Sequence, residues 1–138
     1  MKTITYTNDA GLKFTTTIDT LLEKIKRKDD TIYCVFFSYK VRDNGQGQTL
    51  TMVGSVEDCL AYVLMFSIDA GHGDLFESGG PNWVFVDSQN VDNGSYDELE
   101  IIPLSRAYNH DSLRKVMADD FACVCKNVLA VSSKCQIN

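Results

Sequence analysis

The residues that could do chemistry gather in one acidic stretch in the middle of the chain. Between Asp43 and Ser105 there are eleven Asp or Glu residues and no Lys or Arg. Carboxylates at this density could ligate a metal ion, take part in acid–base catalysis or face a basic partner. Each of these functions demands a different spacing or a different companion residue, so the surrounding sequence can discriminate between them.

Metal binding is not supported by the spacing of the potential ligands. Cys123 and Cys125 form C-x-C rather than the C-x-x-C of zinc sites, and side chains two apart on a helix point about 200° away from each other. A calcium-binding loop that starts at Asp87 would have Val91 at its fifth position and Asp92 where glycine is required. We therefore predict no metal and no other cofactor.

The segment 71–74, which reads GHGD, could hold an acid–base site. His72 is a residue type that titrates near neutral pH, it lies two residues from Asp74, and loops commonly carry catalytic residues. No G-x-S-x-G motif accompanies it, and Cys34 and Cys59 lie in apolar runs typical of inert core thiols. A small hydrolase or transferase that uses His72 and Asp74 therefore stays open as an alternative function.

The charge distribution favours a surface that binds a basic protein. Protein surfaces usually intersperse both signs, whereas a face of one sign speeds the encounter with an oppositely charged partner. Tyr96 lies within the stretch and is a residue type that anchors interfaces. The net charge of −6 argues against nucleic acid as the partner, because phosphate contacts need positive charge. The predicted partner-binding residues are Asp74, Glu77, Asp87, Asp92, Tyr96, Asp97 and Glu98.

The first third of the chain is predicted to contain three or more strands and one helix. Two Thr-rich alternating runs flank the residues 8–11 and predict a β-hairpin. Apolar residues at helical spacing predict a helix over 18–28, whose basic residues form a solvated face. The segment 31–41 is rich in β-branched and aromatic residues, which predicts a central strand with 49–53 as its hairpin partner.

The middle of the chain gives weaker signals. The run 59–66 is apolar on every face, so helix and strand both stay open there, although Ser55-x-x-Asp58 before it resembles a helix capping box. Glycines and a proline predict a loop over 70–82. Asn93-Gly94 predicts a turn within a second loop, 89–98, which would expose the central binding residues. Strands are predicted at 83–88 and 99–104, and Pro103 places the end of the second at a sheet edge.

The C-terminal segment predicts one amphipathic helix of about five turns, which should pack on the sheet. Its stripe consists of Leu113, Val116, Met117, Asp120, Phe121, Val124, Val128 and Val131. Together the elements predict an α+β fold with a mostly antiparallel sheet and two or three helices.

Length and composition predict one globular domain that spans residues 1–138. The longest apolar run is far shorter than the roughly 20 residues that a membrane span needs, and the N-terminus lacks the apolar core of a signal peptide. Five cysteines, an odd number at irregular spacing, predict reduced thiols rather than a disulfide framework. We therefore expect a cytoplasmic protein that does not contact a membrane.

The order of these elements resembles that of the small immunity proteins of bacterial polymorphic and contact-dependent toxin systems. Four patches between Thr17 and Phe121 carry the resemblance: IDTLLEKI, LTMVGS, LAYV and IIPLSRA. It implies a non-enzymatic inhibitor that binds a cognate toxin, often a basic nuclease. A bacteriophage inhibitor of a host defence nuclease would have the same electrostatics and stays open beside it.

Overall fold

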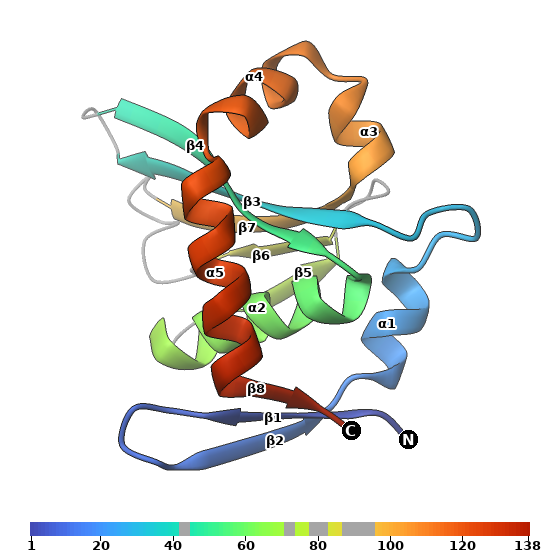
Figure 1. The fold of residues 1–138 in the computed structure, drawn as a ribbon, viewed down its shortest axis with the longest axis vertical. Helices are drawn as coiled ribbons and strands as arrows, with labels where there is room; N and C mark the ends of the chain where they lie inside the picture. Colours follow the sequence, from blue (N-terminus) through green and yellow to red (C-terminus); the bar gives the residue numbers. More distant parts are fainter. Residues whose placement is uncertain (42–44, 71–73, 78–82, 87–95) are drawn as a thin grey trace.

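The structure, a computed structural model, describes residues 1–41, 45–70, 74–77, 83–86 and 96–138. Two antiparallel sheets and five helices make up this described part, so the predicted α+β class is confirmed, whereas two or three helices were too few (Figure 1). The strands are β1 (Thr3–Thr7), β2 (Lys13–Thr17), β3 (Tyr33–Val41), β4 (Gly45–Gly54), β5 (Asp74–Glu77), β6 (Trp83–Val86), β7 (Tyr96–Pro103) and β8 (Cys135–Ile137). The helices are α1 (Asp19–Ile25), α2 (Val56–Ala70), α3 (Leu104–Tyr108), α4 (Asp111–Asp119) and α5 (Phe121–Lys134). Among these helices none is both long and apolar enough to span a bilayer.

The N-terminal hairpin forms as predicted. β1 and β2 pair antiparallel over their full length, and the Asn8 side chain closes the turn by accepting hydrogen bonds from the backbone N–H groups of Ala10 and Leu12. The C-terminal strand β8 pairs with the other side of β1, which gives the sheet order β2-β1-β8. The two chain ends therefore lie close together, and the backbone N–H of Asn138 donates to the carbonyl of Thr3.

The second sheet has the order β4-β3-β7-β6-β5 and contains one departure from the predictions. Part of the predicted loop 70–82 is strand β5, because pairing with β6 supplies backbone hydrogen bonds that local sequence does not reveal. Strand β7 is an interior strand between β3 and β6 rather than an edge strand, and only its end at Pro103 lies at an edge, as predicted. Proline is tolerated there because it is the last residue of β7, beyond the reach of β6, whose pairing ends at Ile101.

The apolar run 59–66 is part of helix α2, which settles the choice that the sequence left open. The Ser55 hydroxyl accepts the backbone N–H of Asp58 at 3.1 Å, as the capping-box pattern predicts. The helix is apolar on every face because it is enclosed by other elements: it contacts β4, β3, β7, α1, α5 and β8. Its central residues from Cys59 to Val63 are buried.

The predicted C-terminal helix is divided into two helices, α4 and α5, so a single helix of five turns is not observed. The break falls at Asp120, whose backbone angles (φ −109°, ψ 16°) depart from helical values. The Asp120 side chain turns to β4, where Oδ2 accepts the backbone N–H of Leu50 at 2.9 Å. Asp120 therefore falls within the predicted apolar stripe because its carboxylate binds the backbone of β4, and not because it buries apolar surface.

Each face of the five-stranded sheet has its own hydrophobic core. On one face α1, α2 and the N-terminal hairpin pack against residues that include Tyr33 and Val35. On the other face α3, α4 and the start of α5 pack against residues that include Phe36. Helix α5 runs along the β4 side of the sheet and contributes Val131 to the first core and Val124 to the second (Figure 1).

All five cysteines lie in the described part of the chain, and each carries a thiol rather than a disulfide. Cys34 and Cys59 are buried, as their apolar context predicts, whereas Cys123 and Cys125 are exposed on α5. Burial, and secondarily the charge of Glu100, raises the pKa of Cys34 to about 12. Burial also raises the pKa of Cys59.

We expect thiol labelling to separate these two classes. In the native protein Cys123 and Cys125 should react first, and Cys34 and Cys59 about a hundredfold or more slowly, because the thiolate is the reactive form. Protein unfolded under non-oxidising conditions should titrate with five thiols, the number in the sequence. A total near one would contradict the prediction of reduced cysteines.

Candidate functional site

Strand β7 carries three of the predicted partner-binding residues. Tyr96, Asp97 and Glu98 were expected in an exposed loop, but they are the first three residues of the strand. They are held there because β3 offers backbone partners as far as Lys40, which is paired with Tyr96. The expectation of a loop is therefore wrong for these residues, and their backbone is fixed by pairing with β3.

The register of the sheet places a fourth predicted binding residue, Asp74, near the β7 residues Tyr96, Asp97 and Glu98. Val86 of β6 is paired with Glu98 on one side and with Asp74 of β5 on the other. Asp74 and Glu98 therefore occupy equivalent positions two strands apart, where their backbones are separated by roughly 10 Å. Glu77 lies at the opposite end of β5, so the sheet does not bring it to this group.

Three residues named by the sequence, His72, Asp87 and Asp92, lie outside the described residues. Of the alternative acid–base pair, the structure thus places only Asp74, by its backbone in β5. Within the described ranges no group of three or more His, Cys, Asp or Glu side chains could hold a metal ion.

Glu98 of β7 lies in surroundings that disfavour a charged carboxylate. Its side chain is half-buried, and this burial raises its pKa above the ordinary value of 4.5. Its cross-strand neighbour in β3 is the neutral Ser38, and no described residue forms an ion pair with it. A carboxylate removed from water without a counter-ion is destabilised, and a cation from a partner would relieve that cost.

We expect Glu98→Gln to raise the thermal midpoint at pH 7 by about 2 °C, because glutamine resembles the neutral form that burial favours. Since the folded pKa is higher than the unfolded one, the folded protein binds the proton more tightly. The wild type should therefore lose stability as pH rises from about 4.5 through the folded pKa. The two proteins should be nearest in stability at low pH. A lower midpoint for Glu98→Gln at pH 7 would contradict this account.

A cleft of about 330 Å³ lies between the sheet and the helices α3 and α4. Side chains alternate along a strand, so Glu98, Glu100 and Ile102 of β7 point to the same face. Glu100 and Ile102 line the cleft, together with Gln48, Arg106, His110, Ser112 and Leu113. The sequence analysis did not detect it, because it arises from helices that pack over strands distant in sequence.

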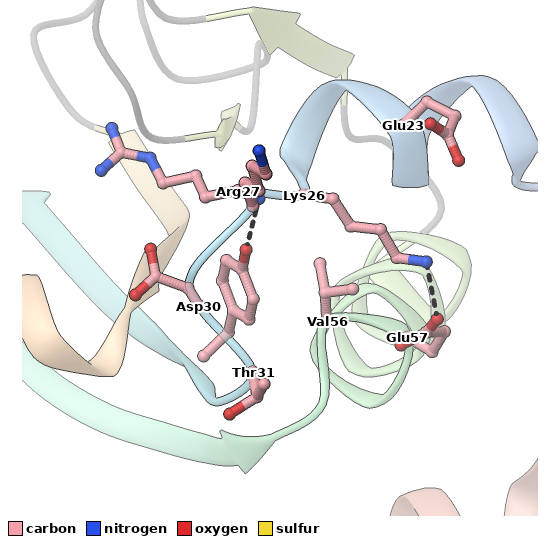
Figure 2. A pocket seen from close by; sticks show the side chains of 9 residues that line it. Glu23, Lys26, Arg27, Asp30, Thr31, Val56 and Glu57 are labelled. Atoms are coloured by element: carbon pink, nitrogen blue, oxygen red, sulfur yellow. Dashed lines mark hydrogen bonds and ion pairs between the residues drawn. The ribbon is translucent and has the colours of Figure 1, made fainter.

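A second cleft, of about 480 Å³, lies between the loop after α1 and the start of α2 (Figure 2). Lys26 reaches across it, so that its Nζ lies 3.3 Å from Oε1 of Glu57, and the Nζ of Lys2 lies 3.1 Å from the same oxygen. One member of the acidic stretch is therefore neutralised by N-terminal cations. The basic residues of the predicted helix are thus not only a solvated face. The lining residues are Glu23, Lys26, Arg27, Lys28, Asp30, Thr31, Tyr33, Val56 and Glu57, with equal numbers of acidic and basic side chains.

We expect Glu57→Gln to destabilise the protein by about 0.5–1 kcal/mol at pH 7, the range of partly exposed ion pairs. Burial alone would raise the pKa of Glu57, but hydrogen bonds from its own backbone N–H, Lys2 and Lys26 outweigh burial and leave the pKa below 4.5. The stabilisation is therefore present above pH 4.5 and is lost as pH falls through the folded pKa. Urea unfolding should show a larger difference from wild type at pH 7 than at pH 3. A difference of the same size at both pH values would mean that packing, rather than charge, is responsible.

The fold and the site together define a two-sheet α+β protein with a carboxylate-bearing strand beside a cleft. Comparison with protein-family models, with curated proteins and with solved structures found no match for the chain.

Proposed function

We propose that this chain is a non-enzymatic binding protein that neutralises a basic protein through the face of β7 that carries Glu98. The observation that supports the proposal most directly is that Glu98 is half-buried, has a raised pKa and lacks a cation among the described residues. A protein selected for stability alone would favour a neutral residue at this position. A carboxylate retained at a cost is typical of functional sites.

Charge and shape both favour a basic protein as the partner. The stretch from Asp43 to Ser105 contributes acids only, and its field would steer a positively charged face towards the molecule. The cleft formed by β7, α3 and α4 is lined in part by the apolar Ile102 and Leu113, which could receive an apolar part of a partner side chain, although Arg106 also lines it.

The resemblance to toxin-immunity proteins implies one source of such a partner: a cognate basic toxin domain, often a nuclease. A host defence nuclease inhibited by a bacteriophage protein is the second source. Both present the same chemistry, a cationic protein surface, so the electrostatic argument applies to either.

The proposal is tested by affinity capture with the intact chain as bait in a lysate of the native host. A single basic protein should be captured stoichiometrically, released by raised salt, and retained poorly by Glu98→Lys. Inhibition of that protein's activity would identify the chain as its inhibitor. Capture of an acidic partner, or binding that neither salt nor Glu98→Lys affects, would contradict the proposal.

A further inference from the structure

The edge strand β2 is unprotected along its whole length. All five of its residues are exposed, and β2 is the outermost strand of its sheet (Figure 1). Phe14 is 41% exposed and Leu12, in the adjoining turn, is 61% exposed. Open edges of this kind invite pairing with another strand, and natural proteins usually shorten, charge or cover them.

The same chain closes another edge in the usual way. Strand β4 is one of the two edges of the larger sheet, and α5, with Asp120 just before it, covers this edge through two side-chain contacts to the β4 backbone. Asp120 accepts the N–H of Leu50, and Asn127 donates to the carbonyl of Thr51 at 2.8 Å. The end strand β8 is only three residues long. Of these three edges, β2 alone is both long and open.

The hydrogen-bond pattern of the hairpin shows which backbone groups of β2 are available. Antiparallel pairs alternate between hydrogen-bonded and non-hydrogen-bonded types. The bonds from Asn8 N–H to the Leu12 carbonyl and from Ile18 N–H to the Lys2 carbonyl fix the even-numbered residues of β2 as the bonded ones. The N–H and C=O groups of the odd-numbered residues, Lys13, Thr15 and Thr17, therefore point outward to solvent.

We infer that two copies of the chain pair through β2, antiparallel and centred on Thr15, to form one six-stranded sheet. In this register Thr15 faces Thr15 of the second copy, and Lys13 faces Thr17. All outward N–H and C=O groups of the three residues are then used, which gives six hydrogen bonds between the copies. This inference is independent of the proposed function, because β2 and β7 belong to different sheets.

The side chains of β2 fit this register. Lys13 meets the neutral Thr17, so no like charges oppose each other. Phe14, which stacks on Tyr6 with ring centroids 6.2 Å apart, would lie opposite Thr16 of the second copy and lose exposed area. Because only five residues take part, the interface is smaller than the roughly 1,200 Å² of stable complexes, and the dimer should be weak.

Sedimentation equilibrium of the intact protein between about 10 µM and 1 mM, the range in which a small interface dissociates, tests the pairing. The weight-average mass should rise towards twice 15.4 kDa with concentration. Thr15→Pro should weaken association about tenfold or more, because it removes the two central donors, whereas the ladder with β1 does not use that N–H. Thr15→Val keeps the N–H and should associate like wild type.

A charge pair tests the symmetric register, and remains informative if Thr15→Pro disturbs folding. Thr15→Lys and Thr15→Glu should each associate about fivefold more weakly than wild type, because like charges then face each other across the two-fold axis. An equimolar mixture of the two should recover association as a heterodimer. A wild type that stays monomeric at 1 mM would overturn the inference. A dimer that none of these substitutions weakens, or a mixture that fails to recover association, would also overturn it.

Discussion

Glu98→Lys is expected to slow association with the basic partner by about tenfold or more at low salt, with a much smaller effect on the fold. The substitution reverses the charge of the half-buried carboxylate at the centre of the proposed surface. The difference from wild type should shrink as salt shortens the Debye length from about 10 Å at 0.1 M to about 3 Å at 1 M. Stopped-flow or surface-plasmon measurements at these two salt concentrations give the association rates directly.

Two variants separate the local effect from the change in net charge. Asp29→Lys makes the same change in charge at an exposed residue of the loop before β3, where β3 pairs with the far end of β7. It should slow association only slightly. Glu98→Gln removes the charge without reversing it and should give an intermediate rate. If Glu98→Lys and Asp29→Lys slow association equally, overall charge rather than the β7 face steers binding. If neither has any effect, the proposed site is wrong.

Sequence patterns predicted most of the elements whose signals are local. The Thr-rich alternation gave the hairpin, and the β-branched and aromatic run gave β3 with its partner β4. The Ser55 cap favoured the helix that the apolar run 59–66 left undecided. In each case the residues that form the element also carry the pattern, so no distant contact was needed.

The errors arose where contacts distant in sequence decide the structure. β5 is a strand because β6 pairs with it, although glycines surround its four residues. Tyr96 belongs to β7 because Lys40 of β3 is available as its partner. The break at Asp120 depends on a backbone group of Leu50, which lies 70 positions away in the sequence. The spacing of apolar residues in the C-terminal segment contains no information about such a distant hydrogen bond, so it predicted one continuous helix.

The sequence named the residues of the candidate site but could not show how they are arranged in space. The absence of Lys and Arg led to the choice of this segment, and three of its named residues lie in β7. The burial of Glu98 depends on how strands β3 and β6 flank β7, and Glu57 is neutralised by Lys2 and Lys26 from outside the segment. The count of charged residues therefore selected the acidic stretch 43–105, whereas the packing of the fold determines which of its carboxylates remain exposed and unpaired.

Asp120→Ala is expected to lower the free energy of unfolding by about 2 kcal/mol, the cost of leaving a largely buried donor without its charged acceptor. The carboxylate closes the edge of β4 by accepting the N–H of Leu50, a residue that is only 3% exposed. Alanine leaves that N–H under α5 without an acceptor. Urea unfolding followed by circular dichroism measures the difference.

The neighbouring Asp119 provides a matched control, because it is exposed at the end of α4 and its side chain forms no hydrogen bond or ion pair with the described residues. Asp119→Ala makes the same chemical change and should alter stability by less than about 0.5 kcal/mol. Asn127→Ala removes the second contact of α5 with the β4 edge and should cost about 1 kcal/mol. If Asp120→Ala costs no more than Asp119→Ala, α5 does not close that edge through Asp120. The contrast between a covered β4 and an open β2 would then no longer support pairing of two copies.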